Sequence, residues 1–352
     1  MIQTYSTTIR RKEMDAVLTC MVDEKIGPGE LNSRLISQVK EFLKCDGSVA
    51  LRSPAIALKY ALLALDLEKG SKIMISALAP AWQYQSVTDL GYEPLVLDVE
   101  ESTGLVNPEI VKDGIQKGGK LLLLHETEGI LPDLTAISQI GIPLIEDISS
   151  SAGAVVPEKD ENGVNTDKVK MAGSFGLFTI MGLEERDVIT AGGGAILMAP
   201  GRREWIVLKK FVDAAPLTDL LPDINSALAW VQVKEYNRNE ASRKELFNLF
   251  QRACMIGKHK MYTREMDNGS TMSSFPLVLS SPYKDVKQYA AKKDIEISLA
   301  YENSVIALKE EELSETCIHA KSLYLRCVHV PLYPRLTHAE AAKIVKVLGS
   351  LP

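Results

Sequence analysis

Residues 142–147 read Ile-Pro-Leu-Ile-Glu-Asp, residues 173–176 read Gly-Ser-Phe-Gly, and residues 191–195 read Ala-Gly-Gly-Gly-Ala. The first segment is a short apolar run that ends in two acids, which predicts a buried strand of a parallel sheet. Such a strand brings Asp147 to the carboxyl end of the sheet, where ligands bind in open α/β folds. The stretch from 142 to 195 therefore predicts both the core of the fold and the position of its site.

Short apolar segments alternate with helical patterns on both sides of this stretch, which predicts βαβ units and a mostly parallel sheet. The polar segment 156–167 predicts a surface loop. We expect strands at 49–51, 72–76, 94–97, 120–125, 143–147, 166–171 and 195–198, and helices at 11–22, 30–44, 56–67, 81–90, 108–117 and 133–140.

The last third of the chain has a different pattern. A long helix is expected at about 222–251, followed by strands at 275–279 and 328–331 and helices at 284–292 and 337–348. This mixture is typical of a small α+β unit. The predicted organisation is thus α/β, with a large domain at 1–221 that includes an N-terminal arm, and a smaller C-terminal α+β domain at 222–352.

Composition excludes several classes of protein. The chain has 352 residues and a net charge of −6, without the recurrent Lys/Arg clusters of a nucleic-acid-binding protein. No apolar run reaches the roughly 18 residues that span a membrane, and the N-terminus lacks an apolar signal core, so a cytoplasmic protein is expected. The five cysteines lack CxxC spacing, so we expect reduced thiols and no metal site.

Several segments, in this order, resemble the DegT/DnrJ-type sugar aminotransferases. They are Gly-Pro at 27–28, Ser-Pro-Ala at 53–55 where the family has Ser-Gly-Thr, Pro-Leu-Ile-Glu-Asp at 143–147, Gly-Ser-Phe-Gly at 173–176, and His-Val-Pro-Leu-Tyr-Pro-Arg-Leu-Thr at 329–337. The resemblance covers some 330 residues. It implies the three-layer αβα fold of pyridoxal-phosphate (PLP)-dependent transferases, a dimer, and a nucleotide-linked keto sugar as ligand.

The family's chemistry requires a lysine that this chain lacks. In the family the lysine forms a Schiff base with PLP and lies a few residues before a Gly-rich strand. Counting back from 193–195 places Arg186 at that position, and a one-residue gap places Asp187 there instead. A guanidinium stays protonated and has no lone pair to attack an aldehyde, and a carboxylate cannot form an imine. We therefore predict no covalent cofactor, so that PLP or its amine form, pyridoxamine phosphate (PMP), would bind only non-covalently.

Other cofactor contacts that the resemblance implies are also altered. At the phosphate-binding turn, Ser53 is kept, Pro54 has no N–H to donate, and Ala55 has no hydroxyl. The serine before the lysine falls on Met181 or Gly182. The remaining changes are Ser150 at the position that contacts the ring oxygen, Thr218 near an asparagine of the neighbouring subunit, and Trp82 and Tyr84 near the ring-stacking position, where either aromatic could belong to the core.

Asp147 alone keeps its implied role, which is to pair with the pyridinium nitrogen. The alternative is an acid that caps the strand end or pairs with Arg186, and we expect that pair because it offsets the desolvation of a buried carboxylate. His125 either lines a pocket at the sheet edge or is a hydrogen-bonded residue at the strand end.

Three functions remain open from the sequence. The first is a non-transaminating homologue that keeps the dimeric fold, and the second is an enzyme that uses non-covalent PLP or PMP, as dehydratase-like relatives do. The third is a binding subunit, either a homodimer or a heterodimer with an active paralogue.

Overall fold

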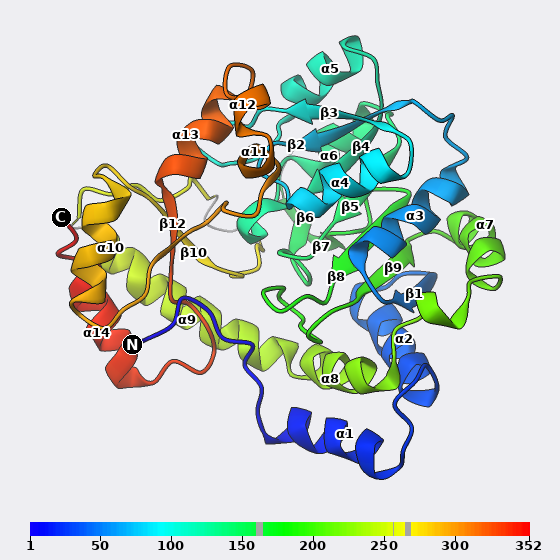
Figure 1. Cartoon of the computed structure of the whole chain (residues 1–352), viewed down its shortest axis with the longest axis horizontal. Helices are drawn as coiled ribbons and strands as arrows, with labels where there is room; N and C mark the ends of the chain where they lie inside the picture. The colour runs from blue at the N-terminus through cyan, green and yellow to red at the C-terminus, as the bar shows by residue number, and fades with distance from the viewer. Residues whose placement is uncertain (160–164, 256, 265–268) are drawn as a thin grey trace.

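The computed structural model describes residues 1–159, 165–255, 257–264 and 269–352 (Figure 1). Its centre is a seven-stranded sheet with the order β1-β9-β8-β5-β4-β2-β3. The strands are β1 Gly47–Leu51, β2 Lys72–Ser76, β3 Glu93–Leu97, β4 Gly119–His125, β5 Leu144–Asp147, β8 Phe178–Gly182 and β9 Ala195–Ala199.

Five neighbouring strands, from β3 to β8, run parallel, whereas β9 and β1 are antiparallel to their neighbours. The register pairs Leu122 with Leu144 and His125 with Asp147. Because parallel strands end at the same edge, His125 and Asp147 lie side by side at the carboxyl end of the sheet. The expected mostly parallel sheet is confirmed.

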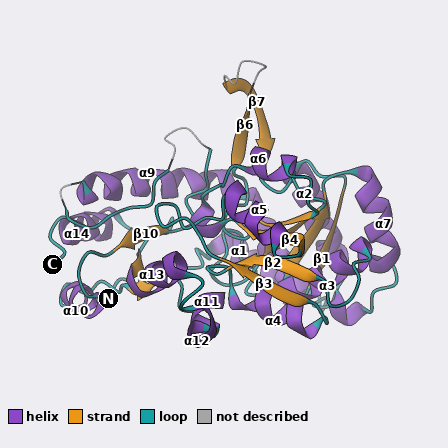
Figure 2. Cartoon of the chain, turned by 90° about the horizontal axis from the view of Figure 1, so that it is seen from above, coloured by secondary structure: helices purple, strands orange, loops and turns teal. Residues whose placement is uncertain are grey.

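Helices cover both faces of the sheet, as the view from above shows (Figure 2). Alternate strand residues supply two cores: Ile73 and Ile75 face one layer, and Met74 faces the other. The helices of this part are α1 Arg11–Val22, α2 Glu30–Leu43, α3 Pro54–Leu65, α4 Ala81–Asp89, α5 Pro108–Gln116, α6 Leu134–Gln139, α7 Arg202–Val212 and α8 Asp223–Lys234, with short 3-10 turns at Thr127–Gly129 and Leu217–Asp219.

The C-terminal part has a three-stranded antiparallel sheet with the order β10-β12-β11. Ile2 forms a bridge with Ile295 and packs in the core of this part, so the first residues lie against the C-terminal sheet. The elements are α9 Tyr236–Cys254, β10 Phe275–Val278, α10 Tyr283–Ala291, β11 Ser298–Leu299, α11 Val305–Leu308, α12 Glu310–Leu313, α13 Ile318–Arg326, β12 Cys327–Val330 and α14 His338–Leu348.

Two expectations about strands were wrong. The segment predicted as a late strand of the large sheet is β7 Asn165–Met171, which pairs with β6 Val155–Lys159 in a separate hairpin that projects from the body (Figure 2). The predicted loop at 156–167 is therefore partly strand, and its residues 160–164 lie outside the described chain. The charged side chains at positions 167, 168 and 170 explain why β7 lies outside the large sheet, because helices cover both faces of that sheet and would bury these charges. The place in the large sheet that was predicted for this strand is taken by β8, which is buried throughout.

The single helix expected at 222–251 is two helices. α8 ends at Lys234 and α9 begins at Tyr236, with Glu235 between them at φ −89° and ψ 2°. No glycine or proline marks the break, so the sequence pattern gave no sign of it.

The described cysteines are all free thiols, and the described residues contain no group of three or more His, Cys, Asp or Glu side chains placed to hold a metal ion. Within those residues, no helix is both long and apolar enough to cross a bilayer.

Candidate functional site

Asp147 lies at the end of β5 and is fully buried. Its Oδ2 accepts hydrogen bonds from Gln83 Nε2 at 2.8 Å and from His125 Nδ1 at 3.0 Å. Its Oδ1 accepts from the Ser149 backbone N–H at 3.1 Å and from Ser149 Oγ at 2.5 Å. A carboxylate has about four acceptor positions, so the side chain is saturated by its own protein.

These contacts also fix the charge of Asp147. Burial by itself raises the pKa of the carboxyl, but the charge and hydrogen bond of His125 and the bonds from Ser149 outweigh it, and the pKa lies below its usual value. Because an ionised carboxylate only accepts, the Nδ1 of His125 must carry a proton. His125 is thus the hydrogen-bonded histidine at a strand end that was one of the two expectations.

The turn before α3 holds the three residues at the implied phosphate site. Ser53 is the N-cap, and its Oγ accepts the Ile56 backbone N–H at 3.2 Å. Pro54 occupies the first helical position, where its missing N–H and fixed φ suit a helix start. Ala55 follows without a polar side chain. Compared with the Ser-Gly-Thr turn, this helix start therefore lacks one backbone N–H and one hydroxyl that would donate to a phosphate.

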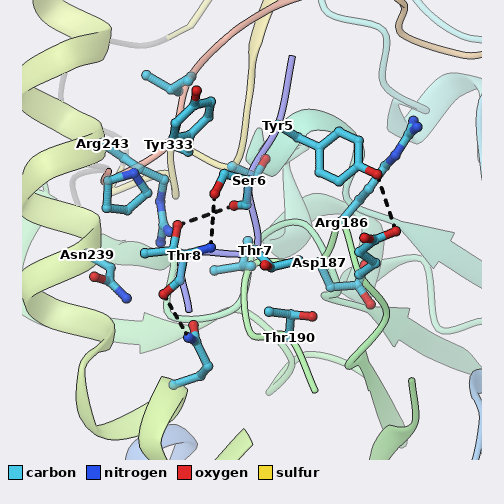
Figure 3. A pocket seen from close by; sticks show the side chains of 16 residues that line it. Tyr5, Ser6, Thr7, Thr8, Arg186, Asp187, Thr190, Asn239, Arg243 and Tyr333 are labelled. Atoms are coloured by element: carbon cyan, nitrogen blue, oxygen red, sulfur yellow. Dashed lines mark hydrogen bonds between the residues drawn. The ribbon is translucent and has the colours of Figure 1, made fainter. Parts of the chain in front are cut away.

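Arg186 and Asp187 lie in the connection between β8 and β9, and their side chains point in different directions. Arg186 is about half exposed, lies 4.5 Å from the Tyr5 ring centre, and contacts Glu302 at 3.5 Å (Figure 3). The expected Asp147–Arg186 pair is therefore wrong, since the arginine turns outward and His125 provides the partner of Asp147.

Asp187 is the residue that turns inward. Its Oδ2 accepts the Glu184 backbone N–H at 2.8 Å. The same oxygen lies 2.3 Å, and Ser149 Oγ 2.8 Å, from the point where a Cβ on Gly182 would be. Glycine at 182 is thus required for the approach of Asp187 to Ser149. Of the two candidates for the lysine position, Asp187 is the one beside the Asp147 network.

The surroundings of Asp187 raise its pKa to about 7. Burial is the main cause, and the negative charges of Asp147 and Glu184 add to it, while the Glu184 N–H and His125 oppose it. Because the folded-state pKa exceeds the ordinary value of 3.8, the folded protein holds a proton that the unfolded chain has released. Stability from this group is therefore lost as pH rises from about 4 to 7.

We expect Asp187→Asn to remove this loss, because asparagine does not ionise. The free energy of unfolding of the wild type should fall by about 2–4 kcal/mol more than that of the variant between pH 5 and pH 8. Urea unfolding at several pH values measures the difference. Asp213→Asn, at an exposed aspartate, is the control and should keep the wild-type slope. If the free energy of unfolding changed with pH by the same amount in the wild type and in Asp187→Asn, the raised pKa of Asp187 would be contradicted.

The other predicted residues lie around this network without joining it. Trp82 and Tyr84 pack against a core cluster of the seven-stranded sheet, in agreement with the core alternative. Met181 is fully buried in another apolar cluster. Ser150 is half-buried and makes no side-chain hydrogen bond to a described residue, and Thr218 is exposed in the 3-10 turn Leu217–Asp219.

Two members of the network, Gln83 and Ser149, were not predicted from the sequence. Gln83 lies between Trp82 and Tyr84 on α4, and successive helix residues point about 100° apart, so it alone reaches Asp147. What distinguishes Gln83 is that it is fully buried, and this burial is visible only in the structure and not in the sequence.

These residues do not fit PLP. The carboxylate that would pair with the pyridinium nitrogen has no free acceptor position, and Asp187 occupies the inward place beside it. The N-terminus of α3 has lost one N–H and one hydroxyl. No reaction step through the cofactor follows from this site.

The chain matches the model of the DegT/DnrJ/EryC1/StrS aminotransferase family over residues 7–207 and 218–349. Its structure resembles the aminotransferase TlmJ from Streptoalloteichus hindustanus, with a TM-score of 0.86, 14% identity, and coverage of 99% of this chain and 98% of that chain.

Two further solved structures are similar. An aminotransferase from Psychrobacter cryohalolentis has a TM-score of 0.83 and 17% identity, over 97% of this chain and 96% of that chain. A histidine-to-asparagine variant of GDP-4-keto-6-deoxymannose-3-dehydratase with bound GDP-perosamine has a TM-score of 0.83 and 16% identity, over 99% and 100%. At these identities the structures establish the fold, which is that of PLP-dependent aminotransferases. The family match covers most of the sequence, and the chain belongs to the DegT/DnrJ/EryC1/StrS aminotransferase family.

Proposed function

We propose that this chain is a non-transaminating member of its family, which keeps the fold but forms no imine with PLP. The observation that carries the proposal is the absence of lysine from residue 171 to residue 208, where the family's Schiff-base lysine is expected. Arg186, or Asp187 with a one-residue gap, occupies the expected position, and neither side chain can form an imine. The protein would then act by binding, with a nucleotide sugar as the ligand class that its family suggests.

The arrangement around Asp147 supports this proposal independently. In an active enzyme an unpaired acceptor must await the cofactor, but here His125, Gln83 and Ser149 supply four donors. Displacing any of them would leave a buried donor unpaired, at a cost of about 1–3 kcal/mol each. Cofactor binding would have to overcome that cost without a covalent bond.

A spectrum tests the proposal directly. We expect purified protein incubated with PLP to show no imine band at about 400–430 nm, and no added mass after borohydride reduction. Arg186→Lys and Asp187→Lys should also remain without the band, because Pro54 and Ala55 still leave the phosphate site incomplete. A stoichiometric adduct trapped on the wild-type chain would refute the proposal. An adduct on either lysine variant alone would show that only the amine had been lost.

An enzyme that uses non-covalent PLP or PMP is the second candidate. The ionised, buried Asp147 favours it, because such a carboxylate could stabilise a pyridinium nitrogen if its present donors moved. Titration with PMP, followed by absorbance and calorimetry, separates the two functions. Binding at micromolar concentration would support the enzyme, whereas a featureless titration supports the binding protein.

We also propose that the protein is a homodimer that uses α1. This helix packs on α8 and lies at the edge of the molecule (Figure 1). Met14, Leu18, Met21 and Val22 are spaced along one side of it, and each is more than half exposed. Apolar side chains that cluster in this way on a surface mark protein contacts.

Leu18→Glu is therefore expected to convert a dimer into a monomer, because it places a charge in the middle of this apolar side. Light scattering after gel filtration measures the mass. Leu325→Glu is the matched control, since Leu325 is similarly exposed but lies on α13. A wild-type protein that is monomeric by itself would instead favour pairing with an active paralogue.

A further inference from the structure

A polar cavity of about 50 Å³ lies between segments that are distant in sequence. Its walls come from the N-terminal segment, the β8–β9 connection, α8, α9, the segment before β10 and the loop after β12 (Figure 3). The lining includes Thr7, Asp187, Arg243, Ser273 and Tyr333. A single water needs roughly 10–15 Å³ by this kind of measure, so the cavity has room for several non-hydrogen atoms.

Arg243 contributes a buried cation to this cavity, with 7% of its surface exposed. Its Nε donates to Glu240 Oε2 at 2.9 Å. Its Nη2 lies 2.9 Å from the same oxygen and is ion-paired with it, but this contact does not have the geometry of a hydrogen bond. Nη2 therefore has no hydrogen-bond partner among the described residues. The guanidinium is thus held in place by Glu240 while part of its donor capacity is unused.

A second unused donor lines the same cavity. The Oγ of Ser273 is buried and has no hydrogen-bond partner in the described part of the chain. The hydroxyls of Thr7 and Tyr333 also make no hydrogen bond to a described residue. A buried donor without an acceptor costs about 1–3 kcal/mol, so the cavity offers donors that a bound acceptor would satisfy.

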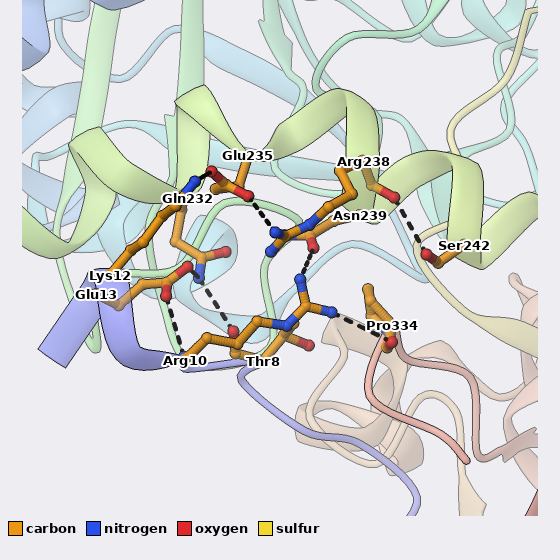
Figure 4. Close-up of polar contacts among 10 residues, drawn as sticks. All are labelled: Thr8, Arg10, Lys12, Glu13, Gln232, Glu235, Arg238, Asn239, Ser242 and Pro334. Carbon is orange, nitrogen blue, oxygen red and sulfur yellow. Dashed lines mark hydrogen bonds and ion pairs between the residues drawn. The ribbon is translucent and has the colours of Figure 1, made fainter.

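The N-terminal wall is fixed on both sides of the cavity. Arg10 donates to Asn239 Oδ1 on α9 at 3.2 Å and to the Pro334 carbonyl at 3.4 Å (Figure 4). On the other side, Tyr5 donates to Glu185 at 3.3 Å and stacks with Arg186 (Figure 3). These contacts hold residues 5–10 across the cavity, which is therefore formed before any ligand enters.

The charges around the cavity make a dianion unfavourable. Arg243 is paired with Glu240 and Arg186 with Glu302, and the acids Asp187 and Glu185 also line the cavity. A dianion would be repelled by these acids, whereas a carboxylate adds one negative charge. A carboxylate also matches the donor edge of a guanidinium and accepts from hydroxyls.

We propose that this cavity binds the carboxylate group of a small organic acid, with Arg243 and Ser273 as its donors. The site lies beside the β8–β9 connection but does not depend on the loss of imine formation, since none of its donors belongs to the Asp147 network.

Carbon-13-labelled acetate is the probe, titrated into the full chain at constant ionic strength and pH 7.5 and followed by NMR line broadening. We expect saturable binding, and about tenfold weaker binding to Ser273→Ala, which removes one hydrogen bond to a charged group. Ser280→Ala is the control, because this exposed serine bonds only the Lys258 carbonyl through its hydroxyl. It should bind acetate as the wild type does.

A double variant tests the cation without leaving a buried charge unpaired. Arg243→Gln combined with Glu240→Gln keeps the local charge balanced and should abolish acetate binding. Acetate binding that is unchanged in both Ser273→Ala and the double variant would overturn the proposal. If the double variant does not fold, Ser273→Ala alone decides. Saturable binding of inorganic phosphate without acetate binding would overturn the assignment to a carboxylate. The imine spectrum with PLP is a separate measurement, so each proposal can fail alone.

Discussion

Asp147→Ala is expected to lower the free energy of unfolding by about 4–6 kcal/mol. The substitution removes the acceptor for His125, Gln83 and Ser149 and leaves their buried donors unpaired. Each unpaired buried donor costs about 1–3 kcal/mol. A domain of this kind has about 5–15 kcal/mol in total, so the variant should be near its limit of stability. Urea unfolding followed by circular dichroism measures the loss.

Asp147→Asn is the matched comparison, because it keeps one acceptor oxygen in the same position. We expect Asp147→Asn to lower the free energy of unfolding by about half as much as Asp147→Ala does. One acceptor oxygen remains, but the amide NH2 group then faces other donors. The folded-state pKa of Asp147 is lowered, so its contribution is present above its ordinary pKa and is lost as pH falls through the folded value. The difference between wild type and Asp147→Asn should therefore shrink in strong acid. A loss below about 1 kcal/mol in Asp147→Ala would contradict the saturated network.

Glu146→Ala is expected to cost about 3–6 kcal/mol. Glu146 is fully buried on the opposite side of β5 from Asp147. It accepts the backbone N–H groups of Gly173 at 2.8 Å and of Phe175 and Gly176 at 2.6 Å. Alanine would leave all three unpaired, and the Gly-Ser-Phe-Gly turn would lose the contact that fixes it before β8. Thermal and urea unfolding measure the effect.

The neighbouring acid Glu126 provides the control for that experiment. Burial, followed by the charge of Glu146, holds the pKa of Glu126 well above its usual range. Glu126 is thus the protonated acid beside Glu146. In Glu126→Gln, the amide keeps a hydrogen-bond donor at this position but cannot ionise. The free energy of unfolding of this variant should therefore equal that of the wild type at pH 6 and exceed it at pH 8. A loss in Glu126→Gln as large as that in Glu146→Ala would contradict this assignment.

Much of the part built on the seven-stranded sheet was predictable because its signals are local. The bounds of α1 and β2 agree with the expected 11–22 and 72–76, since apolar spacing and glycine or proline breaks decide them. β8 was missed because the connection around 173–182 offers no clear alternation, and β7 was misplaced because a hairpin and a sheet strand look alike in sequence. The division between α8 and α9 depends on packing and has no sequence marker.

The sequence by itself determined the family, the position of Asp147 at the sheet edge, and the absence of a lysine after β8. These depend on residue identity and order alone. Only the tertiary structure decided that Asp187 turns inward while Arg186 turns out, and that Gln83, 64 residues before Asp147, completes its hydrogen bonds. The physical reason is that side-chain direction in a connection follows the backbone path. That path is fixed by contacts such as Gly182 with Asp187, which no local pattern encodes.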